Sequence, residues 1–192
     1  MFDIQTQLFE GPDIRFGPID HEKDPEIESR WTHDPEFMRL METSPARPMS
    51  AAMIRKQYEK LEKQVEEDKN LYHFMIRAKA DDRLIGKASI YWIEWANGNA
   101  YLRMGIGSTE DRRKGYGTQA LRMSLRFAFA ELNLFRLTAA VPEYNEGAIA
   151  LFQKFGFVQE VCRRKSLERD GRRWDLYLFG LLNDEWRDQA RA

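Results

Sequence analysis

Arg112-Arg113-Lys114-Gly115-Tyr116-Gly117-Thr118 connects a strand-like run to the start of a long amphipathic helix. Two glycines separated by one residue allow a tight turn, so that successive backbone N–H groups can point at one anion. The N-terminus of the following helix would face the same anion and favour its negative charge. The adjacent Arg and Lys residues add positive charge. The stretch therefore predicts a loop that binds a pyrophosphate group.

The chain before this loop predicts a meander of three strands. Residues 72–80 alternate as a strand, and residues 83–96 form a second run rich in Ile, Tyr and Trp. Asn97-Gly98 is typical of a two-residue hairpin turn. The returning strand, Ala100–Gly107, ends in a glycine-rich segment and leads directly into the loop.

The chain after the loop predicts two helices, a strand and a hairpin. The first helix runs from Tyr116 to about Leu132, because its apolar residues recur at spacings of three and four. The next elements are a strand over 135–141, a helix over 145–155 ended by Gly156, a hairpin over 157–168 and 172–182 that turns at Asp170-Gly171, and a short helix from Asp184.

The N-terminal part predicts one edge strand, over 13–20, and three helices. Asp24-Pro25 and Asp34-Pro35 are typical of helix starts with a capping Asp, and they predict short helices over 25–31 and 35–41. Ser50 begins a long helix to about Lys69. Its expected apolar face contains Met53, Tyr58, Leu61 and Val65. Together the elements predict an α+β fold, with a mixed sheet flanked by helices.

Length and composition favour one soluble domain over residues 1–192. With 30 Lys plus Arg against 31 Asp plus Glu, no global field attracts nucleic acid or a membrane. The single Cys162 cannot form an intramolecular disulfide, and we expect it to be a packed strand residue in a reducing compartment. Residues 1–10 lack a leader pattern. We therefore expect a cytoplasmic protein without nucleic-acid or membrane partners, whose hairpin edges allow a homodimer.

The glycine loop has other interpretations. Residues 115–120 fit the GxGxxA dinucleotide fingerprint, but that motif needs its glycines directly after a strand, and residues 108–114 intervene. A P-loop is excluded because GxxxxGK does not occur in the sequence. A plain surface turn is the default for an isolated GxG. Here the glycine-rich strand end, the RxxGxG spacing and the helix that follows favour an anion site.

A second motif, Asn-Glu-Gly-Ala-Ile-Ala-Leu-Phe-Gln-Lys-Phe-Gly-Phe at 145–157, follows the next strand. Together the two motifs resemble the GNAT acetyltransferase superfamily. The loop is similar to its acetyl-coenzyme A loop, and the second motif to its Asn-to-Gly-Phe helix. The meander, the hairpin at Asp170-Gly171 and the segment 182–186 are most similar to the RimJ/RimL branch. The resemblance spans residues 10–187 and is most specific over 104–157.

The resemblance implies the GNAT fold, a mixed and mostly antiparallel sheet of six to seven strands with a central splay between strands four and five. The pantetheine arm of acetyl-CoA would enter this splay. The residues implied to bind the donor are Met104, Gly105, Ile106, Arg112, Arg113, Lys114, Gly115, Tyr116, Gly117, Thr118, Asn145 and Phe152. No metal is expected, because His21, His33 and His73 lack ligand spacing and read as satisfied surface or core residues.

The implied reaction is direct transfer of an acetyl group to a primary amine in a ternary complex. An ammonium group has no lone pair, so a carboxylate, or a water held by one, should accept the proton. Phe152 stands where the family often has a proton-donating tyrosine. Ala140 and Tyr101 stand where many relatives carry a carboxylate. The alternative is therefore a catalytically idle module that binds or senses acyl-CoA.

A two-residue turn at Asn97-Gly98 would place Glu94 opposite Tyr101 on one face of the sheet. We hypothesise that Glu94, with Tyr101, replaces the missing base. The competing interpretation is that Glu94 is a solvent-facing carboxylate. Tyr144 is a second candidate for the proton donor.

The acceptor is left open among a small amine, a polyamine and a protein N-terminus. A polyamine would need several carboxylates to converge, and Glu36, Glu42 and Glu94 are the candidates. A protein N-terminus would need an open groove. The aromatic residues of the meander either pack in the core or form the wall of the acceptor pocket, and we expect core packing for Tyr91, Trp92, Trp95 and Tyr101.

Overall fold

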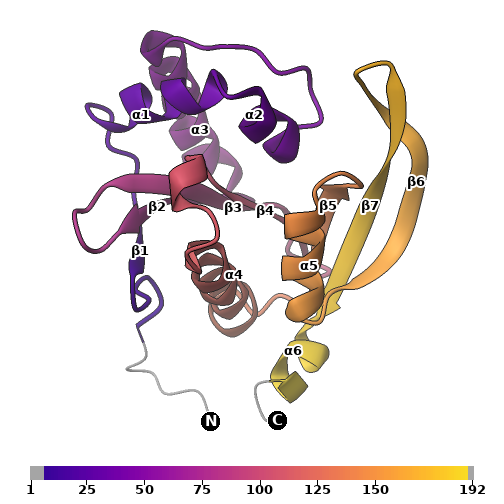
Figure 1. The fold of residues 1–192 in the computed structure, drawn as a ribbon. Helices are drawn as coiled ribbons and strands as arrows, with labels where there is room; N and C mark the ends of the chain where they lie inside the picture. Colours follow the sequence, from indigo (N-terminus) through magenta and orange to yellow (C-terminus); the bar gives the residue numbers. More distant parts are fainter. Residues whose placement is uncertain (1–6, 190–192) are drawn as a thin grey trace.

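Seven strands form one mixed sheet in the order β1-β2-β3-β4-β5-β7-β6, with helices on both faces (Figure 1). The structure is a computed structural model that describes residues 7–189. It confirms the predicted α+β fold. Residues 1–6 of the stretch that lacks a leader pattern lie outside the described range. None of the helices described is both long enough and apolar enough to cross a bilayer.

The strand boundaries follow the predicted ones closely. They are β1 Ile14–Gly17, β2 Tyr72–Ala78, β3 Leu84–Glu94, β4 Asn99–Ile106, β5 Arg136–Pro142, β6 Val158–Arg169 and β7 Arg172–Leu182. β1 is an edge strand, as predicted. Asp170 and Gly171 have φ angles of 53° and 69°, which is the geometry of a type I′ turn and confirms the last hairpin.

The parallel pair β4 and β5 joins the two halves of the sheet over a short distance. Residues 99–101 pair with residues 136–138, and within the described part of the chain no pair of these strands follows Tyr101. β4 continues to Ile106 and β5 to Pro142, so backbone groups along the gap have no strand partner. This gap is the predicted splay between strands four and five.

Helices cover the sheet from both sides. They are α1 Asp24–Thr32, α2 Pro35–Met41, α3 Ala51–Asp68, α4 Tyr116–Arg126, α5 Glu146–Lys154 and α6 Asn183–Gln189, and α4 continues as a π turn over Phe127–Glu131. Leu121 of α4 and Phe152 of α5 share one core with Leu102 of β4. On the opposite face, Tyr58 of α3 packs with Met75 of β2. Figure 1 shows α1, α2 and α3 gathered over the β1 to β4 half.

Two buried ion pairs fasten α1 to the sheet. Asp24 is fully buried and accepts hydrogen bonds from both terminal nitrogens of Arg77, at 3.0 and 2.8 Å. Glu28 lies 2.5 Å from Lys87 Nζ and accepts the Tyr58 hydroxyl at 2.7 Å. Burial acts to raise the pKa of Glu28, but Lys87 and Tyr58 outweigh it and hold that pKa below its usual value.

One predicted helix cap is wrong and another is confirmed. Lys23, and not Asp24, occupies the cap position of α1, because the Asp24 carboxylate binds Arg77 inside the protein. Asp34 caps α2 as predicted and accepts from the Glu36 N–H at 2.9 Å.

Two predictions of burial are also wrong. On α3, Tyr58 is buried as predicted and Leu61 and Val65 are half-buried, but Met53 is 43% exposed and its neighbour Ile54 is buried instead. Cys162 lies in strand β6 as predicted but is exposed, because β6 is the other edge of the sheet.

Replacing Asp24 with Ala should destabilise the fold strongly. Arg77 would remain buried without its counter-charge, which typically lowers the free energy of unfolding by about 3–5 kcal/mol. Urea denaturation measures the loss. Glu67→Ala, which removes one exposed pair with Lys63, is the control and should cost under about 1 kcal/mol. Equal losses in the two variants would contradict an anchoring role for Asp24.

Candidate active site

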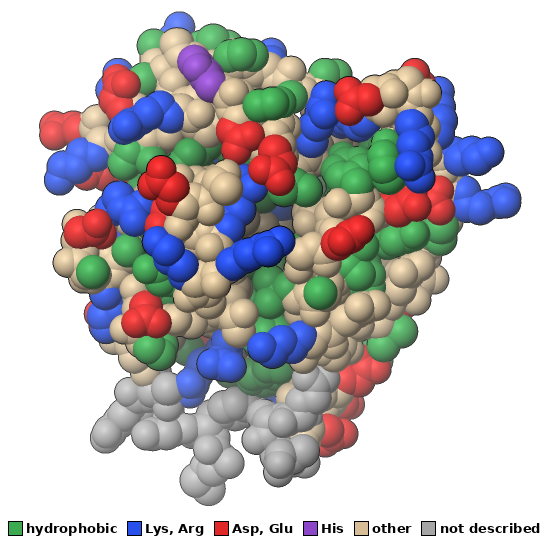
Figure 2. Space-filling model, in the orientation of Figure 1, with side chains coloured by type: hydrophobic (Ala, Val, Ile, Leu, Met, Phe, Trp, Pro, Cys, Tyr) green, Lys and Arg blue, Asp and Glu red, His purple; other side chains and the backbone are tan. Residues whose placement is uncertain are grey.

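A cleft of about 750 Å³ lies where β4 and β5 separate, between the end of β4, the glycine loop, α5 and α2. Figure 2 shows this face hollowed between the two halves of the molecule, with Lys and Arg side chains at the rim. Lys114 and Tyr116 do not line the cleft. The predicted donor-binding residues that do line it are Met104, Gly105, Ile106, Arg112, Arg113, Gly115, Gly117, Thr118, Asn145 and Phe152.

The glycine loop has the geometry of an anion site. Arg113 and Gly115 both have positive φ, 59° and 84°, and a Cβ added at Gly115 would meet no atom within 4 Å. The first hydrogen bond of α4 runs from the Gln119 N–H to the Gly115 carbonyl. The backbone N–H groups of residues 116–118 therefore have no carbonyl partner within the helix. They present the positive end of the helix to the cleft.

The Arg112 side chain is held by the fold. Its guanidinium lies 3.0 Å from Glu36, 3.5 Å from Asp34 and 3.1 Å from the Gly107 carbonyl. It thereby joins the loop to α2. Arg113 lines the cleft and has no ion pair among the described residues, so it is the charge that the loop keeps for a ligand. Lys114 lies outside the lining, 3.9 Å from Asp111.

The glycines at the end of β4 bring α1 and α2 close to the sheet. A Cβ at Gly105 would lie 2.0 Å from Met41 Sδ, and one at Gly107 would lie 2.1 Å from the Trp31 ring. Sequence reasoning connected these glycines with the cleft and missed this packing role, because it depends on helices that are distant in the chain.

Helix α2 also holds the other rim of the cleft. Asn145 caps α5 by accepting from the Ala148 N–H at 3.1 Å, and its amide donates to the Leu40 carbonyl at 3.2 Å. The Tyr144 hydroxyl donates to the Arg39 carbonyl at 2.9 Å. Tyr144 therefore acts as a brace in this structure, and its proton is already engaged.

The tip of the β6–β7 hairpin reaches α2 as well. Arg39 forms two hydrogen bonds with Asp170, at 2.9 and 3.0 Å. Arg169 donates to the carbonyls of Thr43 and Ser44 at 2.6 and 3.2 Å. We call these contacts the α2–hairpin bridge. It connects the two halves of the sheet beyond the open end of the gap, and the sequence carried no signal for it.

The cleft fits the expected donor. An unpaired strand edge suits an extended arm with amide groups, and the loop with its helix N-terminus suits a pyrophosphate. Phe152 is 6% exposed and packs on Phe157 with ring centroids 4.9 Å apart, so it supplies an apolar wall and no exchangeable proton.

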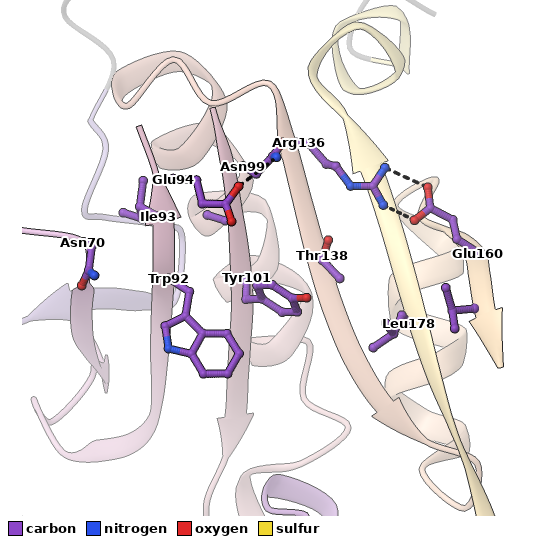
Figure 3. A pocket seen from close by; sticks show the side chains of 12 residues that line it. Asn70, Trp92, Ile93, Glu94, Asn99, Tyr101, Arg136, Thr138, Glu160 and Leu178 are labelled. Atoms are coloured by element: carbon purple, nitrogen blue, oxygen red, sulfur yellow. Dashed lines mark hydrogen bonds and ion pairs between the residues drawn. The ribbon is translucent and has the colours of Figure 1, made fainter. Parts of the chain in front are cut away.

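A second cavity, of about 590 Å³, lies at the end of the gap where β4 and β5 still pair, and we call it the acceptor pocket. Figure 3 shows Tyr101 of β4 and Thr138 of β5 side by side, with Trp92 next to Tyr101. Glu94 also lines this pocket. Arg136 and Glu160 form an ion pair at its far side.

The predicted register around Glu94 is wrong. Tyr91, and not Glu94, lies opposite Tyr101, while Glu94 pairs with Asn99. The turn is longer than two residues, and a bulge at Trp92, with φ of 52°, adds residues to β3. Glu94 therefore lies nearer the closed end of the gap than Tyr101.

The expected core packing of the meander aromatics is wrong for the two tryptophans. Trp92 is 64% exposed and Trp95 is 50% exposed. Trp92 packs edge-on against Tyr101 with centroids 5.4 Å apart, so it forms a wall of the acceptor pocket. A large residue held at positive φ is strained, and such strain is found where a side chain is fixed for function.

A third cavity, of about 460 Å³, adjoins the acceptor pocket at Asn70 and Trp92, and we call it the side cavity. His73 lines it. The Nδ1 atom lies 2.8 Å from Ser89 Oγ, while Nε2 is buried and has no hydrogen-bond partner among the described residues. The expectation of a satisfied histidine is wrong here. Burial, together with Lys87, lowers the pKa of His73 to about 4.

The three carboxylates considered for a polyamine do not converge. Glu36 binds Arg112 at the donor cleft, and Glu42 binds Arg103 at 3.0 Å. Within residues 7–189, the Glu94 carboxylate accepts only from the side-chain amides of Asn97 and Asn99. In the described range, no group of three His, Cys, Asp or Glu side chains could hold a metal ion.

Residues 13–158 match the family model described as "Acetyltransferase (GNAT) domain". A Bacillus subtilis (strain 168) protein named "Probable N-acetyltransferase YjcK" is 33% identical over 132 residues, 68% of this chain and 72% of that protein. The spermidine N-acetyltransferase of Vibrio cholerae, solved with CoA and spermine, has a TM-score of 0.78 at 18% identity, covering 92% of this chain and 99% of that one. The ribosomal-protein-S5-alanine acetyltransferase of Vibrio fischeri has a TM-score of 0.77 at 20% identity, and the match covers 93% of this chain and 97% of that one. These two structures share the fold.

Half-buried His73, whose ring is kept neutral by its surroundings, predicts that the free energy of unfolding falls in acid. Its pKa of about 4 lies below the ordinary value of about 6.5, so the unfolded chain takes up the proton first as the pH falls. The stabilisation is complete above about pH 6.5 and is lost towards pH 4, by at most about 3 kcal/mol. Urea unfolding at several pH values measures this, and His73→Gln should flatten the dependence. If His73→Gln keeps the wild-type pH dependence of the free energy of unfolding, His73 is not the group responsible.

Proposed function

The chain belongs to the GNAT acetyltransferase family, whose members use acetyl-CoA, and we propose that it acetylates a primary amine by direct transfer within a ternary complex. The observation that carries the proposal is the gap between β4 and β5, with the donor cleft along its open end and the acceptor pocket at its closed end. Both cavities are lined by residues of the same strand, β4, within a few positions of each other.

We assign the donor to the cleft. Bound there, acetyl-CoA supplies the activated acetyl group. Met104, Gly105 and Ile106 offer backbone groups along the unpaired edge of β4, and Asn145 orients the start of α5 on the other side. The N–H groups of residues 117 and 118 and the charge of Arg113 hold the pyrophosphate, while Arg112 keeps the loop against α2. Lys114 and Tyr116 support the same site from the loop, beside the residues that line the cleft.

We assign the amine to the acceptor pocket, beside Tyr101 and Thr138. The amine must be neutral to react, so its proton needs an acceptor. Glu94 lines the same pocket and forms no ion pair within the described range, and we retain it as the proton acceptor. Figure 3 shows the Tyr101 hydroxyl directed toward Thr138 and away from Glu94, so the proton reaches Glu94 through water.

The RimJ/RimL-like branch and a single domain over residues 1–192 are part of the same proposal. The second candidate function is an idle module that binds acyl-CoA. Phe152 favours it, since this ring fills the place of a proton-donating tyrosine. The two functions share the donor cleft and differ only in turnover.

Acetyl-CoA should stabilise the protein, and amines should then release CoA from it. At about 100 times its dissociation constant, a ligand that binds only the folded state adds about 2.7 kcal/mol of stability. A thermal shift measures binding, and a thiol assay over a panel of amines measures transfer. A nicotinamide cofactor is the control ligand and should give no shift. Binding without CoA release from any amine would favour the idle module.

Glu94→Gln should lower kcat about 100-fold, because general-base catalysis usually contributes at least that factor. The rate should be followed from pH 6 to pH 10, since the loss should shrink as more of the amine becomes neutral in solution. Glu168→Gln, an exposed carboxylate paired with Arg173, is the matched control. Turnover of Glu94→Gln within about twofold of wild type would exclude the proposed role.

A further inference from the structure

The side cavity differs in chemistry from the acceptor pocket that it adjoins. Two of its walls carry cations, but Lys87 lies 2.5 Å from Glu28 and Arg103 lies 3.0 Å from Glu42. These ion pairs neutralise the charges. The remaining polar lining consists of uncharged side chains that donate or accept hydrogen bonds, namely Thr43, Gln64, Asn70, His73, Ser89, Tyr91 and Trp92.

His73 contributes to this cavity a ring nitrogen that lacks a hydrogen bond. Its Nε2 atom is buried and has no partner in the described part of the chain, while Nδ1 is occupied by Ser89. A buried polar atom without a hydrogen bond costs about 1–3 kcal/mol. A ligand group that reaches Nε2 recovers that cost. Since the tautomer is not fixed, the suitable group is one that can both donate and accept.

The sheet fixes how far this atom is from the gap. His73 pairs with Ser89, and Ser89 pairs with Arg103 of β4, so the three residues form one row across neighbouring strands. Adjacent strands lie about 4.8 Å apart, which puts the strand of His73 about 10 Å from β4. The Tyr91 and Trp92 side chains lie between the side cavity and the gap. A molecule with its amine at the gap can therefore extend past Trp92 into the side cavity.

We propose that the side cavity binds the non-reacting end of the acceptor through an uncharged group that donates and accepts hydrogen bonds, such as a carboxamide, and that His73 Nε2 is its partner. The acceptor is then an amine with a neutral polar group about 10 Å away. This inference rests on the proposed acetyl transfer. It also separates the chain from a binder of polycations, because no carboxylate of the described residues lines the side cavity, and Glu28 and Glu42, which contact its two cations, are engaged by them.

The test compares three acceptors of similar length, namely 6-aminohexanamide, heptylamine and 1,7-diaminoheptane. Wild type should use the amide with a kcat/KM at least about tenfold above that for heptylamine, since one hydrogen bond to a buried group is worth about this factor. His73→Leu should remove the preference by raising the KM for the amide. The kcat/KM for heptylamine should stay within about twofold of the wild-type value. His73→Gln should restore part of the preference. His21→Leu, at an exposed histidine paired with Glu62, is the control.

Calorimetric titration of the amide and heptylamine into the protein with CoA present measures the same contrast without turnover. If amines are acetylated but the amide has no advantage, or if His73→Leu affects all three acceptors alike, the inference is overturned and the acetyl transfer stands. A preference for the diamine also overturns it. If no amine is acetylated or bound, the proposed function fails, and the inference fails with it.

Discussion

The short pairing of β4 with β5 is the constraint on which the rest of the structure depends. Residues 99–101 and 136–138 join two halves of a sheet that then separate. Backbone groups along the gap must find partners that are not strands, and this need creates a place for an extended ligand. Each half keeps its own outer pairs, β3 with β4 and β5 with β7, so the gap is held open from both sides.

Ion pairs on α1 and α2 hold this arrangement together, and one of them uses Arg112, which the sequence predicted to bind the ligand. Arg77 and Lys87 fix α1, while Arg103 and Arg112 fix the ends of α2. With α1 and α2 in place, the glycines of β4 allow close packing beside the cleft. Of the two cations that line the cleft, Arg112 is paired with acidic residues at the start of α2, and Arg113 has no ion pair among the described residues. This is why the chemistry of the cavities is decided by so few residues.

The sequence predicted the parts whose signals are local. The glycine loop, the end of the 145–155 helix at Gly156 and the Asp170-Gly171 turn each follow from conformational preferences of a few adjacent residues. The register of Glu94 was not predictable, because the bulge at Trp92 changes which residues face each other and leaves no distinct pattern. The orientation of Asp24 and the unpartnered Nε2 of His73 depend on residues far away in the chain. No spacing rule describes such contacts.

The α2–hairpin bridge makes the gap a closed ring: one end is joined by backbone pairs and the other by side chains. The two joints differ in strength. Arg39 and Asp170 are 41% and 72% exposed, and an exposed pair contributes at most about 1 kcal/mol. The side-chain joint is therefore the weaker of the two, and opening it costs less free energy than separating the backbone pairs of β4 and β5. An opening of this ring therefore starts at the contact between Arg39 and Asp170, while β4 and β5 stay paired at the other end.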